Sequence, residues 1–263
     1  MEIIAKISKG SKMDQVYIPR NRSGFSTGSY VVLKPLETKK ITEKPYLYNI
    51  KHIEPIKLQI INEVFETIDK NVNEYENIII TGSFIDKGFN FNDIDIILVS
   101  EGKINIHDIK NIIEQKTGIK THIILLDNKT LIQGLSTDPL YQMMLSRCIV
   151  KKRFIYKIKP KINYKILDIH LLKSKTLMDG FDLLDGNEKY YLTRNMVAIH
   201  LFLKNKKVSN ELVDREIIRL FELKEINEIK QNMLDKNEFL RKYKSFYERT
   251  FNEIMRNIKN DAK

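Results

Sequence analysis

The chain has 263 residues, of which 42% are hydrophobic and 30% charged, a composition typical of a globular protein that can bury a core. One cysteine, Cys148, excludes an internal disulfide, and the apolar runs are too short to span a bilayer, so we expect a cytoplasmic protein with no membrane partner. The net charge of +11 is concentrated at residues 1–51 and 151–175, which favours a polyanionic partner, although a genome bias towards Ile, Lys and Asn explains it equally well.

Short β-strands are expected near the start of the chain. Apolar and β-branched runs at residues 3–7, 15–18 and 29–33 alternate with Gly, Pro, Asn and Ser, which favour turns. Residues 1–34 therefore predict a small β module. The prolines and lysines that follow predict a linker over residues 35–51.

Helix and strand patterns alternate over residues 52–127. Pro55 suits the first turn of a helix, and the apolar residues after it recur at i, i+3 and i+4. The expected elements are a helix from Pro55, strands at Asn77–Thr81 and Asp93–Val99, a helix at Ile106–Lys116, and a strand at Lys120–Leu126.

Residues 128–263 predict a mainly helical region. The exception is the basic segment 151–165, where alternating lysines and Pro160 predict an edge strand. The last helix carries an aromatic and aliphatic stripe that begins at Phe239 and indicates packing against a core. Together the elements predict an α+β protein with a β module, an α/β core with a mixed sheet, and a helical C-terminal region.

One segment carries the residues for chemistry. A strand ends at Gly82-Ser83, a nine-residue loop follows, and the next strand opens with Asp93 and Asp95. Residues two apart in a strand point to the same face, so both carboxylates converge, and their repulsion favours a cation such as Mg²⁺ or Mn²⁺. The glycine allows a phosphate to approach the backbone, and the serine can donate to it.

This segment resembles the signature of the polymerase-beta-like nucleotidyltransferase superfamily, in which Gly-Ser is followed by Asp-hydrophobic-Asp on a second strand. The resemblance implies transfer of a nucleoside monophosphate from a nucleoside triphosphate to an acceptor, such as RNA or protein. It implies that Asp93 and Asp95 bind the metal ions, that Gly82 and Ser83 hold the triphosphate, and that Lys87 assists electrostatically.

The third catalytic carboxylate of that superfamily has no direct counterpart here. The position expected for it aligns best with His122, and Asp127 lies five residues later at the opposite parity. His122 can act as a base or a ligand, whereas Asp127 suits the cap of the next helix. Either His122 replaces the carboxylate or the site is weakened.

The first 34 residues resemble the AbrB-like swapped-hairpin family, on the strand, Pro19, basic run and final strand after Gly28. The resemblance implies a homodimer and DNA contacts through Arg20 and Arg22; a β appendage used only for dimerisation is the alternative. The corresponding alternative function is a DNA-binding regulator or toxin–antitoxin component whose nucleotidyltransferase module only senses nucleotide.

Two further patterns have both a functional and a structural interpretation. Lys157, Lys159 and Lys161 lie among aromatic residues and could contact nucleic acid, or could form a solvated edge. Arg194-Asn195 with His200 resembles the Arg-Asn…His motif of HEPN-type helical RNases. The apolar surroundings of His200 favour a buried structural histidine instead.

Overall fold

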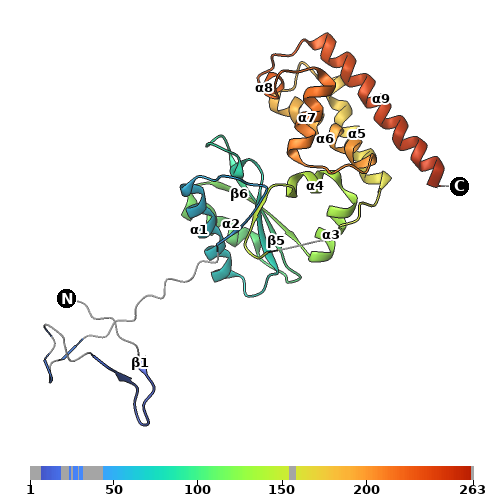
Figure 1. Ribbon diagram of the computed structural model, residues 1–263. Coiled ribbons are helices and arrows are strands. Elements are labelled where there is room, and N and C mark those ends of the chain that lie inside the picture. Colours follow the sequence, from blue (N-terminus) through green and yellow to red (C-terminus); the bar gives the residue numbers. More distant parts are fainter. Residues whose placement is uncertain are drawn as a thin grey trace. The chain divides into compact units, whose positions relative to one another are not determined.

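The computed structural model describes residues 7–18, 24, 26–28, 30–31, 44–153 and 158–261, and Figure 1 shows their arrangement. The chain divides into two compact units, residues 1–42 and 43–263. In the first unit, β1 (Ile7–Ser8) pairs antiparallel with β2 (Gln15–Val16). β1 overlaps the expected run 3–7 only at Ile7, and β2 lies within the expected run 15–18. Arg20 and Arg22 lie outside the described residues.

A five-stranded mixed sheet forms the first half of the second unit, in the order β3-β7-β4-β5-β6. Only β5 and β6 run parallel, because a helix connects them; the other neighbours are antiparallel. The strands are β3 (Tyr46–Tyr48), β4 (Asn77–Thr81), β5 (Asp93–Val99), β6 (Lys120–Leu126) and β7 (Cys148–Val150).

Helices cover both faces of this sheet, which explains why β4 is a continuous apolar run buried along its whole length. α1 (Pro55–Asn71) and α2 (Ile106–Thr117) pack on the face that includes Ile94 and Ile96. α3 (Asn128–Thr137) and α4 (Pro139–Leu145) pack on the opposite face, with Ile97 and Val99.

The sequence predictions for residues 55–126 are confirmed element by element. Two short strands were not expected: β3 lies in the predicted linker, and β7 lies in the region predicted to be mainly helical. Each has only three residues, too few to show a period of two. Their pairing with each other and with β4 comes from backbone hydrogen bonds between distant segments.

The second half of the unit is a helical bundle around α6 (Gly186–Leu203), which begins with a capping box of Asp185 and Glu188. Around it lie α5 (Tyr164–Asp179), α7 (Asn210–Phe221), α8 (Asn227–Lys230) and α9 (Lys236–Asp261). The predicted stripe of α9 packs through Phe239, Tyr243 and Phe246. The architecture is therefore α+β.

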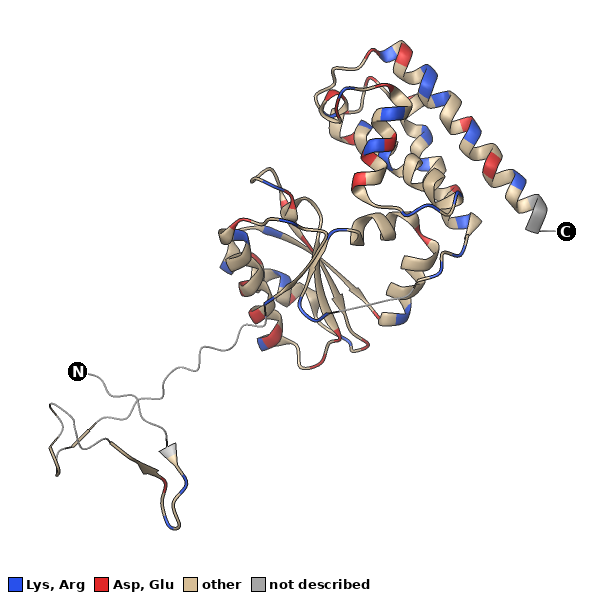
Figure 2. Ribbon diagram, in the orientation of Figure 1, with Lys and Arg blue, Asp and Glu red and all other residues tan. Residues whose placement is uncertain are grey.

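The predicted edge strand over 151–165 is wrong for the residues described. Residues 158–163 form no strand, and α5 begins at Tyr164 because the Asn163 side chain accepts a hydrogen bond from the Ile166 amide. Lys157 lies outside the described residues, and Lys159 and Lys161 are exposed. Figure 2 shows basic residues along the segment that leads into α5.

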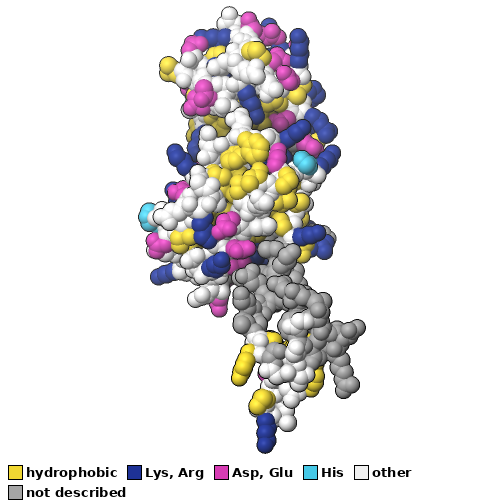
Figure 3. Space-filling model, turned by 90° about the vertical axis from the view of Figure 1, so that its left-hand side faces the viewer, with side chains coloured by type: hydrophobic (Ala, Val, Ile, Leu, Met, Phe, Trp, Pro, Cys, Tyr) yellow, Lys and Arg dark blue, Asp and Glu magenta, His cyan; other side chains and the backbone are white. Residues whose placement is uncertain are grey.

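Hydrophobic side chains are exposed at several points of this unit, for example Phe89 and Tyr191. Figure 3 shows one area where such side chains gather on the face that it draws, with Lys and Arg side chains around it. Within the described ranges no helix combines the length and apolar character needed to cross a bilayer.

Candidate functional site

The strand register brings three candidate residues together at one end of the sheet. Asp95 on β5 lies opposite Thr81 on β4 and opposite His122 on β6. Asp93 and Asp95 share the sheet face of Ile97, as their spacing predicts. The Gly82-Ser83 turn follows Thr81 directly, so the turn, the two aspartates and the histidine meet at the start of β5 and β6.

Gly82 is required by its conformation and by its closeness to Asp95. Its backbone has φ +82° and ψ −163°, a region that essentially only glycine adopts. A Cβ at this position would lie 2.1 Å from Oδ2 of Asp95. A short 3-10 turn, Ser83–Ile85, follows, and the exposed Ser83 begins it. The Asp95 side chain therefore occupies the space that a side chain at residue 82 would need.

The carboxylate of Asp95 is influenced by the like charge of Asp93 and by its neighbour His122. Partial burial and, to a lesser extent, the neighbouring Asp93 raise its pKa above the ordinary value. The His122 ring opposes this shift, with Nδ1 3.5 Å from Oδ1 of Asp95. A cation bound at this point would relieve the same repulsion.

Asp93 and Asp95 fit a divalent metal only if water and substrate supply its other ligands. Within the described residues, no group of three or more His, Cys, Asp or Glu side chains is arranged to hold a metal ion. Mg²⁺ commonly binds one or two carboxylates and completes its shell with water and substrate phosphates. The Asp93–Asp95 pair beside an open glycine turn is compatible with that kind of binding.

A buried lysine supports the loop that joins the turn to β5. Lys57 on α1 has no exposed surface, and its Nζ donates to the carbonyl oxygens of Asp86 and Gly88, each at 2.5 Å. The ammonium group also lies 5.3–5.8 Å from the ring centroids of three phenylalanines, Phe84, Phe89 and Phe91. A cation in this position fixes both the backbone and the aromatic side chains of the loop.

Two further charged residues hold the same loop from outside. Glu54 accepts a hydrogen bond from the Gly88 amide at 2.7 Å, which lowers the pKa of Glu54 to about 2, and it lies 3.3 Å from Lys57. Arg147, just before β7, donates to Oδ1 of Asp86 at 2.6 Å and to the carbonyl of Ile85 at 3.4 Å. The loop is thus tied both to α1 and to the start of β7.

Sequence reasoning missed these supporting residues, although one left a signal. Lys57 lies four residues before Ile61, so it falls on the apolar face of α1, where a charged residue needs a buried partner. Arg147 gave no local signal, because its partner Asp86 is 61 residues away.

The remaining predicted residues have different surroundings. Lys87 is exposed on the loop, and its role stays a prediction. Asp127 caps α3, as its side chain accepts a hydrogen bond from the Thr130 amide at 2.6 Å, so the capping interpretation is confirmed. His122, and not Asp127, lies beside Asp95.

A basic hollow lies beside the loop at the same end of the sheet. Its volume is about 360 Å³, and its lining includes three basic residues, Lys51, Arg147 and Lys207, against one carboxylate, Glu211 of α7. The α7 amide of Asn210 donates to Ser146 Oγ at 3.3 Å, which joins the bundle to the sheet here. Through Arg147, which donates to the Ile85 carbonyl, this hollow adjoins the loop that follows the glycine turn.

The Arg-Asn…His pattern lies inside the bundle. His200 and Asn195 are each 2% exposed, and the His200 ring contacts Phe246 edge to face. His200 Nδ1 lies 3.3 Å from a Glu253 carboxylate oxygen, but it makes no hydrogen bond. Burial lowers the pKa of His200 to about 4. The structural interpretation of this histidine as a buried residue is confirmed.

Comparisons of the chain with protein-family models, with curated proteins and with solved structures gave no significant match.

Proposed function

We propose that this protein is a metal-dependent nucleotidyltransferase that moves a nucleoside monophosphate from a nucleoside triphosphate to an acceptor hydroxyl. The observation that supports the proposal most is the meeting of Asp93, Asp95 and His122 beside a glycine turn that leaves no room for a side chain. The residues resemble the polymerase-beta-like signature, and the order of helices and strands around them agrees with that superfamily's core.

In the proposed reaction the acceptor oxygen attacks the α-phosphorus, a new P–O bond forms, and the bond to the β-phosphate breaks. Pyrophosphate leaves with the electron pair. Asp93 and Asp95 would hold Mg²⁺ or Mn²⁺, which neutralises charge on the phosphate oxygens when bound. The Ser83 hydroxyl and the amides of the turn donate to the triphosphate, and the basic hollow with Arg147 and Lys207 attracts the anionic substrate.

His122 would serve as the proton acceptor for the attacking hydroxyl. Its side chain is 65% exposed, so a substrate can reach it, and its contact with Asp95 orients the ring. A neutral imidazole can take a proton, which is the role of the missing carboxylate. This assignment explains how the site could work with two aspartates.

The proposal is tested by incubating the protein with Mg²⁺ or Mn²⁺, each α-³²P-labelled nucleoside triphosphate, and RNA or protein extract. We expect labelled product from the wild type and none from Asp93→Asn/Asp95→Asn. His122→Gln should slow transfer by about 10²–10⁴-fold. Asp127→Asn is the matched control, because asparagine also caps a helix, and it should keep the wild-type rate.

Two outcomes would count against the proposal. Label transfer that survives the double substitution would remove the aspartates from the reaction. If no acceptor is labelled but the wild type alone binds nucleotide with metal, the module senses nucleotide and the regulator function becomes the better account.

A further inference from the structure

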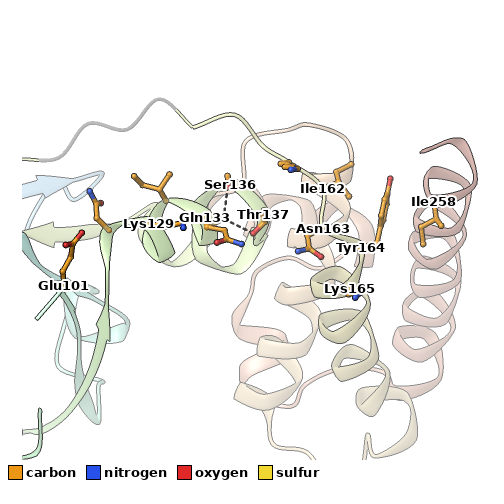
Figure 4. Close-up of a pocket in the computed structure, with 13 residues that line it drawn as sticks. Glu101, Lys129, Gln133, Ser136, Thr137, Ile162, Asn163, Tyr164, Lys165 and Ile258 are labelled. Carbon is orange, nitrogen blue, oxygen red and sulfur yellow. Dashed lines mark hydrogen bonds between the residues drawn. The ribbon is translucent and has the colours of Figure 1, made fainter. Parts of the chain in front are cut away.

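A second, larger depression lies apart from the aspartate pair. It has a volume of about 1030 Å³ and is bounded on one side by α3 and on the other by residues 161–165 and Ile258 of α9. Figure 4 shows Lys129, Gln133 and Ser136 on the α3 side, facing Asn163 and Tyr164 across the groove. We call this depression the α3–α5 groove.

The groove is at the far end of the strands that carry the aspartates. Its lining includes Glu101, which follows β5, and Asn128, which follows β6, whereas Asp95 lies near the start of β5. Six residues of extended chain separate Asp95 from Glu101, which is about 20 Å at 3.3 Å per residue. The groove is therefore a separate site and not part of the candidate active site.

The rim of the groove is positively charged. Lys129, Lys161 and Lys165 line it and are all exposed, whereas Glu101 is its one lining carboxylate. Within the described residues, neither Lys161 nor Lys165 forms an ion pair. The first turns of α3 and α5 contribute Lys129 and Lys165 to the lining, while the Asp127 and Asn163 side chains cap the two helices.

The floor of the groove is mostly apolar and has flat and branched surfaces. Ile132, Ile162 and Ile258 contribute, and the Tyr164 ring lies between Asn163 and Ile258 in Figure 4. The Lys161 amide donates to the Ser136 carbonyl at 2.7 Å, so the two walls are joined by the main chain. The volume of about 1030 Å³ lies just above the range of about 300–1,000 Å³ for small-molecule sites, which favours an extended ligand.

We propose that the α3–α5 groove binds single-stranded nucleic acid, with phosphates on the lysine rim and bases on the floor around Tyr164. Single strands expose both the charge and the flat base surfaces that such a groove can use, whereas a duplex offers mainly its backbone. The inference goes beyond the transfer reaction. If that proposed function holds, it also names the class of acceptor.

The test measures binding of fluorescent 20-nucleotide single-stranded RNA, single-stranded DNA and duplex RNA to the full chain over a series of salt concentrations. Lys129→Gln/Lys161→Gln/Lys165→Gln should weaken single-strand binding at least tenfold. It should also reduce the slope of log K against log salt by about 2, since each phosphate contact on a single strand contributes about 0.7. The RNA and DNA arms show which sugar the groove prefers.

A matched variant, Lys103→Gln/Lys224→Gln/Lys244→Gln, removes the same charge from exposed positions outside the groove and should bind like the wild type. Tyr164→Ala should weaken binding by at least about fivefold, whereas Tyr164→Phe should not. Equal loss in both triple variants, or duplex binding as tight as single-strand binding, would overturn the proposal. Competition by polyglutamate as strong as by RNA would overturn it too.

These measurements test the proposal for the groove and the proposal for the candidate active site independently. Asp93→Asn/Asp95→Asn should bind the single strand with wild-type affinity even though it transfers no label. If the groove variant loses nucleic-acid binding and the wild type never transfers label, the groove proposal is supported and the transferase function is contradicted. If the wild type transfers label and the groove variant binds nucleic acid as well as the wild type, the transferase function is supported and the groove proposal is contradicted.

Discussion

Buried polar groups in the sheet half and in the helical bundle differ in whether they have hydrogen-bond partners. In the sheet half, the fully buried ammonium of Lys57 donates to two loop carbonyls and lies beside Glu54. In the bundle, three buried atoms have no hydrogen-bond partner among the described residues: Arg194 Nε, Asn195 Oδ1 and His200 Nδ1. The satisfied lysine shapes a loop next to the candidate site, whereas the unsatisfied histidine stays neutral inside α6. Burial alone therefore does not identify a functional polar residue; its partners do.

The largest expected effect on stability comes from removing the buried ammonium group of Lys57. Lys57→Met leaves two loop carbonyls and Glu54 without their cation, so we expect the free energy of unfolding to fall by about 3 kcal/mol. Lys70→Met is the control on the same helix, since Lys70 is exposed and 3.7 Å from Glu66, and it should change stability by less than about 0.5 kcal/mol. Urea unfolding of both variants measures the difference, and equal values would show that the buried cation is not what holds the loop.

The buried His200 predicts that the stability of the folded chain depends on pH. His200 has a pKa of about 4 in the folded chain and about 6.5 when unfolded, so below pH 6.5 only the unfolded chain gains the proton. Stability should therefore fall by about 3 kcal/mol as the pH drops from 6.5 to 4, and this part of the loss should be missing in His200→Gln. The charged groups near the ring are Lys204, Lys206, Glu216, Arg249 and Glu253. Parallel stability curves for the two proteins over this range would contradict the account.

Comparing two glycines with positive φ distinguishes the stability cost of backbone strain from the cost of a collision with Asp95. A side chain at Gly82 would collide with Asp95, whereas one at Gly88 would have nothing within 4 Å. Gly88→Ala should cost about 1 kcal/mol for its backbone conformation alone, and Gly82→Ala about 1–2 kcal/mol more. Thermal unfolding gives both values. If the two substitutions cost the same, Gly82 is not packed against the aspartate as described.

The smallest expected effect is a gain in stability at the candidate site. Because burial and Asp93 raise the pKa of Asp95, the folded chain is disfavoured as the pH rises through that pKa. Asp95→Asn removes the repulsion and should stabilise the metal-free protein at pH 7, by no more than about 1 kcal/mol because solvent screens the exposed part. A clear loss of stability in a urea titration would mean that the carboxylate has a structural partner that the geometry does not reveal.

The sequence predicted the part of the molecule that local patterns encode. The strands at Asn77–Thr81 and Asp93–Val99, and the parity that puts Asp93 and Asp95 on one face, follow from period and spacing. His122 was predicted only from the resemblance to the superfamily, and the parallel pairing of β5 and β6 places it opposite Asp95.

The supporting contacts could not be predicted in the same way. β3 and β7 have three residues each and pair across about a hundred residues of chain. Arg147 meets Asp86 only because β7 lies beside β4. The predicted basic edge strand was wrong because residues 158–163 pair with no strand among the described residues and lead directly into α5, which Asn163 caps. Such features depend on the assembled sheet and bundle.

The central claim, a metal and nucleotide site at Asp93 and Asp95, is tested most directly by Mn²⁺ binding followed through the electron paramagnetic resonance signal of the free ion. With a nucleoside triphosphate present, we expect the wild type to remove Mn²⁺ from solution and Asp93→Asn/Asp95→Asn to leave it free. Asp127→Asn should behave like the wild type. Equal Mn²⁺ binding by the wild type and the double variant, or none by either, would contradict the claim.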